Sequence, residues 1–136
     1  MNYTTTGPNL DRATASSAGL DLRATEDTAI MRGTITKIST GVNVEIPDGH
    51  VGLLAVRSGL ASKGVILANG VGIIDADYRG EIGVMLTRLT PGHTHVKAGD
   101  RVAQLVIVPA WLGEPACVAE LSGTERGSGG FGSTGR

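Results

Sequence analysis

The chain has 136 residues and a formal net charge of −1, and 40% of its residues are hydrophobic although only 3% are aromatic. This length predicts one domain, whose core must be built from aliphatic side chains. Lysines and arginines are scattered, which argues against a nucleic-acid polymer as partner. No apolar run is long enough to predict a membrane span.

Short β-rich runs alternate with turn signals along the chain. Apolar and polar side chains alternate over Thr34–Ile46, which predicts a strand with one buried face. Val51–Val56 is nearly all apolar, as expected of a strand buried on both faces. Val71–Asp75 and Glu81–Leu89 flank the turn signal Asp77–Gly80 and predict a hairpin.

The only helix that the sequence predicts is short. Ser58–Lys63 begins with a residue type that caps helices, and Gly64 favours termination after it. Arg101–Pro109 predicts a further buried strand. With 21 glycines for tight turns, the pattern is typical of an all-β sandwich or barrel.

Cys117 is the single cysteine, so no disulfide forms within one chain, and a reducing compartment fits. It lies in the apolar stretch Pro115–Leu121, where we expect it to be a small buried side chain. The first residues have no apolar core and do not resemble a signal peptide. The sequence therefore predicts a cytoplasmic protein.

Two polar segments have residue types that suit work on a phosphate compound. Ile74–Gly80 has two aspartates, Asp75 and Asp77, at the end of an apolar strand. Either one of them is a general base or holds a metal-bound water, or both are ordinary turn residues. Arg57, Ser58 and Gly59 follow a buried strand and form either a phosphate cradle or an ordinary strand-to-helix turn.

Other polar residues are less distinctive. Asp21 lies between apolar residues of a predicted strand. Gln104 lies inside an apolar strand, where its amide is either a core hydrogen-bonding group or a ligand contact. His93 and His95 point to one side of a strand with no obvious third ligand, so we expect surface residues rather than a metal site.

The segment Arg126–Arg136 reads RGSGGFGSTGR and holds the only phenylalanine, Phe131. It has almost nothing apolar to bury, so one reading is a disordered tail. The other is a mobile lid, in which Phe131 stacks on a base while Arg126, Ser133 and Thr134 hold phosphate oxygens.

Five segments, in this order, resemble the five motifs of the homotrimeric dUTP pyrophosphatase (dUTPase) family. They are AGLDL at Ala18–Leu22, RSGLA at Arg57–Ala61, NGVGIIDADYRGE at Asn69–Glu81, GDRVAQLV at Gly99–Val106 and RGSGGFGSTG at Arg126–Gly135. The resemblance implies a β jelly roll at residues 1–125, with a flexible glycine-rich lid at residues 126–136. It also implies a homotrimer with active sites between subunits, in which each lid closes over a site built by the other two chains.

The resemblance assigns roles to individual residues. Asp75 would be the base, and Tyr78 would pack under the deoxyribose and leave no room for a 2′-hydroxyl. Asp21 would support a magnesium-water shell or orient an arginine. The uracil edge would be read by Asn69 and by the backbone of Ile73, Ile74 and Gly83. Phosphates would be held by Arg57, Ser58, Gly59 and Gln104. The lid would use Arg126, Phe131, Gly132, Ser133 and Thr134.

The implied activity is hydrolysis of dUTP to dUMP and pyrophosphate with Mg²⁺, which limits uracil incorporation into DNA and supplies dUMP for dTTP synthesis. Two departures are Val56, where the family commonly has proline, and Gly83, where it often has a longer side chain. The alternatives are an enzyme related to dCTP deaminase and a regulatory binding protein with this fold. The complete fifth motif and Asp75 argue against the deaminase. The presence of Asp75, Tyr78 and Phe131 argues against a binding protein without activity.

Overall fold

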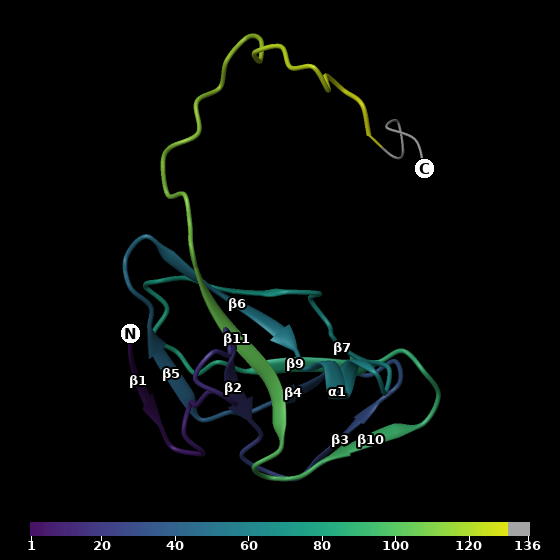
Figure 1. Ribbon diagram of the computed structural model, residues 1–136. Coiled ribbons are helices and arrows are strands. Elements are labelled where there is room, and N and C mark those ends of the chain that lie inside the picture. The colour runs from purple at the N-terminus through teal and green to yellow at the C-terminus, as the bar shows by residue number, and fades with distance from the viewer. Residues whose placement is uncertain (131–136) are drawn as a thin grey trace.

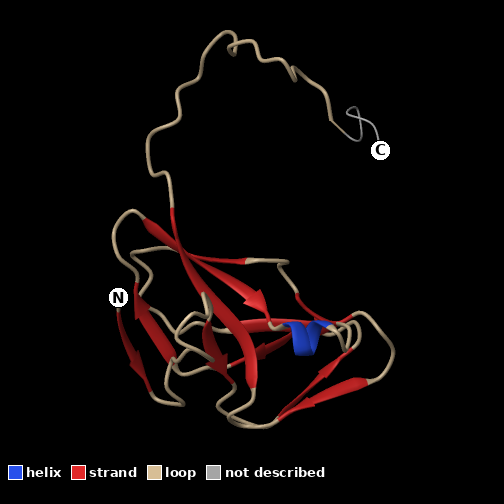
Figure 2. Ribbon diagram, in the orientation of Figure 1, coloured by secondary structure: helices blue, strands red, loops and turns tan. Residues whose placement is uncertain are grey.

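The computed structural model describes residues 1–130 (Figure 1). In chain order, the elements are β1 (Asn2–Thr5), β2 (Leu20–Arg23), β3 (Thr28–Met31), β4 (Thr36–Ile38), β5 (Val42–Glu45), β6 (His50–Val56), α1 (Ser58–Ala61), β7 (Val65–Leu67), β8 (Gly72–Ile74), β9 (Val84–Arg88), β10 (His93–Val96) and β11 (Arg101–Pro109). The all-β prediction is confirmed, because strands dominate and α1 is a single turn (Figure 2).

Antiparallel pairing joins the strands into four sheets. The largest has the order β2-β11-β6-β8, and a second has the order β4-β9-β7. The pairs β1-β5 and β10-β3 complete the set. Within residues 1–130 the strands do not close into one barrel. No helix in this part of the chain is long and apolar enough to cross a membrane.

The predicted hairpin of Val71–Asp75 with Glu81–Leu89 is wrong. β8 pairs with β6, so that Gly72 lies opposite Leu54, whereas β9 lies between β4 and β7 in the three-stranded sheet. Residues 75–83 therefore form a loop between two sheets instead of a tight turn.

Three smaller predictions also need correction. The predicted strand Thr34–Ile46 is interrupted at Gly41, whose φ of +67° is in the left-handed region, and it forms β4 and β5. The N-cap of α1 is Arg57 rather than Ser58, and no side chain caps this end. Cys117 is exposed, not buried, because the segment that carries it leaves the body of the protein.

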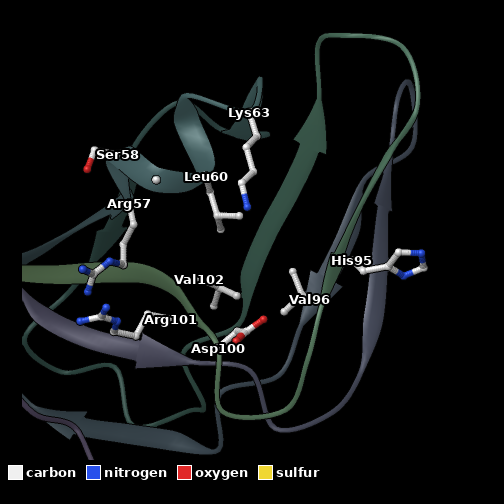
Figure 3. Close-up of a pocket in the computed structure, with 10 residues that line it drawn as sticks. Arg57, Ser58, Leu60, Lys63, His95, Val96, Asp100, Arg101 and Val102 are labelled. Carbon is white, nitrogen blue, oxygen red and sulfur yellow. The ribbon is translucent and has the colours of Figure 1, made fainter.

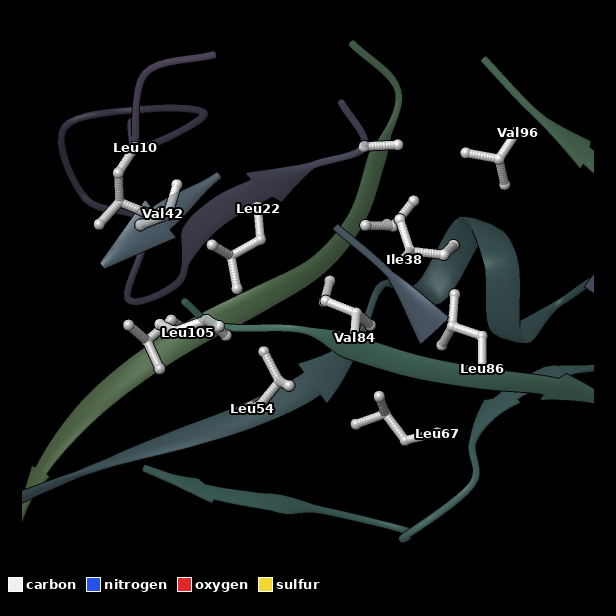
Figure 4. Packing of buried hydrophobic residues seen from close by; sticks show 14 of the residues in the cluster. Leu10, Leu22, Ile38, Val42, Leu54, Leu67, Val84, Leu86, Val96 and Leu105 are labelled. Carbon is white, nitrogen blue, oxygen red and sulfur yellow. The ribbon is translucent and has the colours of Figure 1, made fainter. Parts of the chain in front are cut away.

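The core is aliphatic, as the composition predicts. Leucines from β2, β6 and β11, namely Leu22, Leu54 and Leu105, meet Val84 and Leu86 of β9 (Figure 4). Burial of each such side chain stabilises the fold by roughly 1.5–3 kcal/mol. The packing of the large sheet on the smaller one fixes β2, β6, β8 and β11, whose ends carry the polar residues of interest.

After β11 the chain leaves this body. Ala110 still donates its N–H to the carbonyl of Gly49, at 2.9 Å, and residues 111–130 then run outward without a strand or helix (Figure 1). Apolar side chains in this segment, Trp111 and Leu121 among them, are 76% and 84% exposed. Such a segment buries little of its own apolar surface against the chain that carries it.

Candidate active site

One group of polar residues gathers where β2, β6 and β11 meet, and we call it the arginine cluster: Asp21, Arg57, Ser58, Arg101 and Gln104. Gln104 in β11 lies opposite Asp21 in β2 on one side and opposite Ala55 in β6 on the other. Arg57 and Ser58 follow β6 directly. A cavity of about 350 Å³ opens here, lined by Asp21, Arg57, Ser58 and Gln104 among others.

Asp21 is the buried centre of this cluster, with 4% of its side chain exposed. Its Oδ1 atom accepts a hydrogen bond from Arg57, and its Oδ2 atom lies 3.4 Å from Nη1 of Arg101. Two guanidinium groups thus share one carboxylate, which leaves the cluster with a net positive charge. Such an arrangement suits phosphate oxygens, which accept charge-assisted hydrogen bonds from arginine.

Both oxygens of Asp21 therefore face arginines. Of its two predicted roles, the geometry favours orientation of an arginine over support of a magnesium-water shell. Among residues 1–130 no three carboxylate, histidine or cysteine side chains gather in a way that could hold a metal ion. The protein groups described thus do not form a cage of their own for Mg²⁺.

A second group lies at the far end of β8, and we call it the nucleoside cluster after the role that the resemblance implies for it: Ile73, Ile74, Asp75, Tyr78 and Gly83. These residues line a cavity of about 160 Å³ together with Glu81 and Ile82. Asp75 is exposed, and its carbonyl accepts a hydrogen bond from the N–H of Tyr78, at 3.1 Å. Asn69 lies outside this cavity, exposed in the turn after β7.

The ring of Tyr78 has a defined position although 45% of the residue is exposed. Its hydroxyl donates a hydrogen bond to the carbonyl of Glu81, at 3.0 Å. A Cβ atom on Gly80 would lie 2.4 Å from that hydroxyl oxygen, so the ring folds back over Gly80 and a side chain there would displace it.

Glu81 is a residue that the sequence reasoning did not single out. One of its oxygens accepts hydrogen bonds from Ser39, Thr40 and Gly41. The hydrogen bond from the Ser39 hydroxyl, followed by that from the Gly41 N–H, lowers the pKa of Glu81. The carboxylate therefore stays ionised and joins the loop of the nucleoside cluster to the connection between β4 and β5.

Gly83 departs from the family pattern, and the structure shows what occupies the space. A Cβ atom at this position would lie 2.6 Å from Cε of Lys37. The alkyl stem of Lys37, which projects from β4, therefore passes where a side chain on residue 83 would begin. Val56, the other departure, pairs with Ala103 as an ordinary strand residue.

The two clusters lie at opposite ends of β6 within one chain. Ile74 lies opposite Gly52 near the start of β6, whereas Arg57 follows its last residue. Continued by one residue, this register places Asp75 beside Val51, six residues before Arg57. At about 3.3 Å per residue, Asp75 and Arg57 are therefore roughly 20 Å apart along the strand. The structure brings the predicted residues together as two half-sites rather than one.

A further depression of about 450 Å³ adjoins the arginine cluster on the side of α1. Figure 3 shows that the side chains of Arg57 and Arg101 extend in the same direction, while His95 points away. His93 and His95 are both exposed, which confirms that they are surface residues. Leu60, Val96 and other apolar side chains line the depression beside Lys63 and Asp100.

The residues that the sequence predicts to form a lid fall at or beyond the end of the described structure. Arg126 is exposed, and its carbonyl accepts the N–H of Gly129 at 3.0 Å. Phe131, Gly132, Ser133 and Thr134 lie outside the described residues. Gly59 lines the depression beside α1 rather than the cavity with Gln104.

Comparison with known proteins gives a consistent result. The dUTPase family model matches residues 5–135. A deoxyuridine 5′-triphosphate nucleotidohydrolase of Desulfitobacterium hafniense (strain DSM 10664 / DCB-2) is 50% identical over 127 residues, which cover 90% of this chain and 84% of the relative. The protein of the same name from Anaeromyxobacter sp. (strain Fw109-5) is 48% identical over 124 residues, with the same two shares, 90% and 84%.

Solved structures agree with the sequence comparison. A mutant dUTPase of Staphylococcus bacteriophage 80alpha with dUpNHpp aligns with a TM-score of 0.90 and 30% identity, over 99% of each chain. A mutant dUTPase from phage phi11 of S. aureus, described with a structural Mg(II) ion, aligns with a TM-score of 0.79 and 28% identity, over 88% of this chain and 98% of that one. The extent of the family match and the identity to these relatives show that this chain belongs to the dUTPase family.

Proposed function

We propose that this protein hydrolyses dUTP to dUMP and pyrophosphate. The observation that carries the proposal is the pair of half-sites. One offers arginines, a hydroxyl and an amide for phosphates, and the other offers a carboxylate and a tyrosine beside a small cavity. Relatives at about half identity are named for this reaction, and the family covers nearly the whole chain.

The carboxylate of Asp75 acts as the general base. It takes a proton from a water molecule, whose oxygen attacks the α-phosphorus in line with the bond to the leaving group. The bond between the α-phosphorus and the bridging oxygen breaks, and pyrophosphate leaves with that oxygen. Asp75 suits this role because it is exposed at the end of β8 and lines the nucleoside cavity. General-base catalysis of this kind contributes roughly 10²–10⁴-fold.

The arginine cluster binds the phosphates. Arg57, Ser58 and Gln104 line one cavity, and Asp21 holds the Arg57 guanidinium toward it. Gly59 contributes its backbone at the start of α1. Because these groups are fixed before the substrate arrives, they stabilise developing charge without reorganisation.

The nucleoside cluster selects uracil and deoxyribose. The backbone of Ile73, Ile74 and Gly83 reads the uracil edge together with Asn69. The ring of Tyr78 lies under the sugar and leaves no volume for a 2′-hydroxyl. The hydrogen bond from its hydroxyl to the carbonyl of Glu81 holds the ring in this position, over the bare backbone of Gly80.

The active form is a homotrimer, and each site combines half-sites of different chains. Two features support this proposal: the separation of roughly 20 Å between Asp75 and Arg57, and the exposed apolar segment after β11. Arg126, Phe131, Gly132, Ser133 and Thr134 form the lid over a site built by the other two chains. Residues 1–125 then form the β jelly-roll domain and residues 126–136 the lid.

Mg²⁺ is the metal ion that membership of the dUTPase family implies. The described residues offer arginines rather than a carboxylate cage, so the metal would be held by the phosphate oxygens of dUTP. When bound, it neutralises charge on the triphosphate. Positioning of the phosphates and removal of the water proton fall to the side chains named above.

Product analysis tests the proposal directly. The purified protein with Mg²⁺ is incubated separately with dUTP, dCTP, dTTP and UTP, and products are separated by ion-exchange chromatography. We expect dUMP and pyrophosphate from dUTP and little turnover of the other three. Release of ammonia from dCTP would favour the deaminase, and no turnover of any nucleotide would favour a binding protein. Light scattering should give about three times the chain mass of 13.9 kDa.

A further inference from the structure

The loop of residues 75–83 joins β8 to β9 and carries the groups that we propose contact the nucleoside. It has no strand or helix of its own. Backbone bonds to a neighbouring segment hold its second half: Ile82 donates its N–H to the carbonyl of Val42, at 2.8 Å, and accepts the Thr40 hydroxyl, at 2.7 Å. The shape of the loop therefore depends on the segment between β4 and β5.

Glu81 adds a side-chain connection between the same two segments. A single oxygen, Oε1, accepts the Ser39 hydroxyl at 2.5 Å and the N–H groups of Thr40 and Gly41 at 2.9 and 3.0 Å. Three donors on one ionised oxygen form a stronger attachment than neutral hydrogen bonds would. The proposed chemistry makes no use of this carboxylate, so its three bonds call for another role.

The backbone of Glu81 continues the connection to the substrate wall. Its carbonyl accepts the hydroxyl of Tyr78, and the Tyr78 ring folds back over Gly80. Glu81 thus contacts Ser39–Gly41 through its side chain, and it contacts the Tyr78 hydroxyl through its own main-chain carbonyl. A shift of Glu81 would carry the tyrosine hydroxyl with it.

We propose that Glu81 is a positioning residue for deoxyribose selection: by anchoring the loop to Ser39–Gly41, it sets the height of the Tyr78 ring under the sugar. The inference rests on the proposed function, in which Tyr78 excludes the 2′-hydroxyl. It assigns Glu81 no contact with substrate and no proton to move.

The test measures kcat and KM for dUTP and for UTP in the full-length protein with Mg²⁺. Glu81→Ala should raise KM for dUTP and narrow the preference for dUTP over UTP by about threefold to tenfold. This is the size of one ordinary hydrogen bond and less than that of one to a charged group, because Glu81 acts on the sugar only through Tyr78. The kcat for dUTP should change less, because Asp75 precedes the anchored half of the loop. Glu81→Gln should restore much of the preference, since its amide oxygen is still an acceptor for these donors.

Two controls keep the result specific. Glu26→Ala removes an exposed glutamate outside this loop and should leave the preference unchanged. Ser39→Ala removes one of the three donors to the Glu81 carboxylate and should narrow the preference for dUTP over UTP by a smaller factor. If Glu81→Ala does not fold, this variant tests the positioning role instead.

The outcomes separate this inference from the proposed function. If Tyr78→Ala narrows the preference while Glu81→Ala and Ser39→Ala leave it unchanged, the positioning role is wrong and the proposed function stands. If Tyr78→Ala also leaves the preference unchanged, the role of Tyr78 fails and the inference fails with it. A lower melting temperature with an unchanged preference would reduce Glu81 to a purely structural residue.

Discussion

Gly19 and Gln104 lie so close that a Cβ atom on residue 19 would be 2.5 Å from Oε1 of Gln104 and 3.1 Å from its Cβ. Gly19 precedes β2, and Gln104 lies in β11, where both line the cavity of the arginine cluster. The absence of a side chain at residue 19 therefore gives the Gln104 amide its place. In the motif AGLDL, Gly19 therefore helps to shape the arginine cluster by leaving space for Gln104, just as Asp21 does by its contacts with the arginines.

Gly19→Ala should move the Gln104 amide and weaken phosphate binding. We expect KM for dUTP to rise by about tenfold, the size of one lost hydrogen bond to a charged group. Gly123→Ala is the matched control, because a Cβ there meets nothing within 4 Å. Steady-state kinetics of both variants check the prediction, and an unchanged KM in Gly19→Ala would show that Gln104 does not contact substrate.

Asp75→Asn should lower kcat by about two orders of magnitude or more, because the amide keeps the shape but cannot accept the water proton. Asp77→Asn is the matched control, since Asp77 is also exposed but does not line the nucleoside cavity. Turnover of dUTP by the two variants is compared at saturating substrate. Near-normal turnover in Asp75→Asn would exclude it as the base.

The ionised carboxylate of Glu81 should stabilise the folded protein at neutral pH and lose this effect at acidic pH. Hydrogen bonds, first from Ser39 and then from Gly41, lower its pKa below the ordinary value of 4.5. Its contribution is therefore present above that value and is lost as the pH falls through the lower pKa of the folded state. The charged group of Lys37 lowers this pKa further, so salt should reduce the effect.

Melting temperatures of the wild type and Glu81→Gln, measured between about pH 6 and about pH 3, check this prediction. The wild type should be the more stable at the upper end, and the difference should shrink toward the lower end. A difference that is constant with pH would mean that the charge of Glu81 makes no contribution.

The sequence predicts strands better than it predicts their partners. Val51–Val56 and Arg101–Pro109 are correctly placed as β6 and β11, because a strand's apolar pattern is local. The hairpin of Val71–Asp75 with Glu81–Leu89 fails because pairing depends on residues far away: β8 finds its partner in β6. A turn signal shows where the chain bends but not which strand it meets next.

The same limit applies to the site. Asp75 and Arg57 stand out because their motifs are continuous in sequence. The roles of Arg101 and Glu81 come from partners that lie 80 and 42 residues away, Asp21 and Ser39. No local pattern contains those contacts. Arg101 lies three positions before Gln104 in the fourth motif. This proximity to a predicted phosphate ligand is the one sequence signal that points to a role for Arg101.

The separation of the half-sites predicts complementation between inactive chains. Arg57→Ala removes the phosphate contact from one half-site, and Asp75→Asn removes the base from the other. If each site takes Arg57 and Asp75 from different chains of a closed ring, a mixed trimer keeps one intact site. Two differently tagged variants are co-expressed and purified through both tags, so that only mixed trimers remain.

We expect such mixed trimers to show about one third of the wild-type activity, since one of three sites is intact in either composition of a cyclic trimer. As controls, trimers that contain only one of the two variants are prepared with both tags in the same way, and they should stay inactive. Melting temperatures check that all of these proteins are folded. Arg57→Ala should fold, because Arg101 still faces the buried carboxylate of Asp21. If each chain held a complete site, every site in a mixed trimer would carry one defect. Activity no higher than that of the two parent variants would therefore refute the shared site.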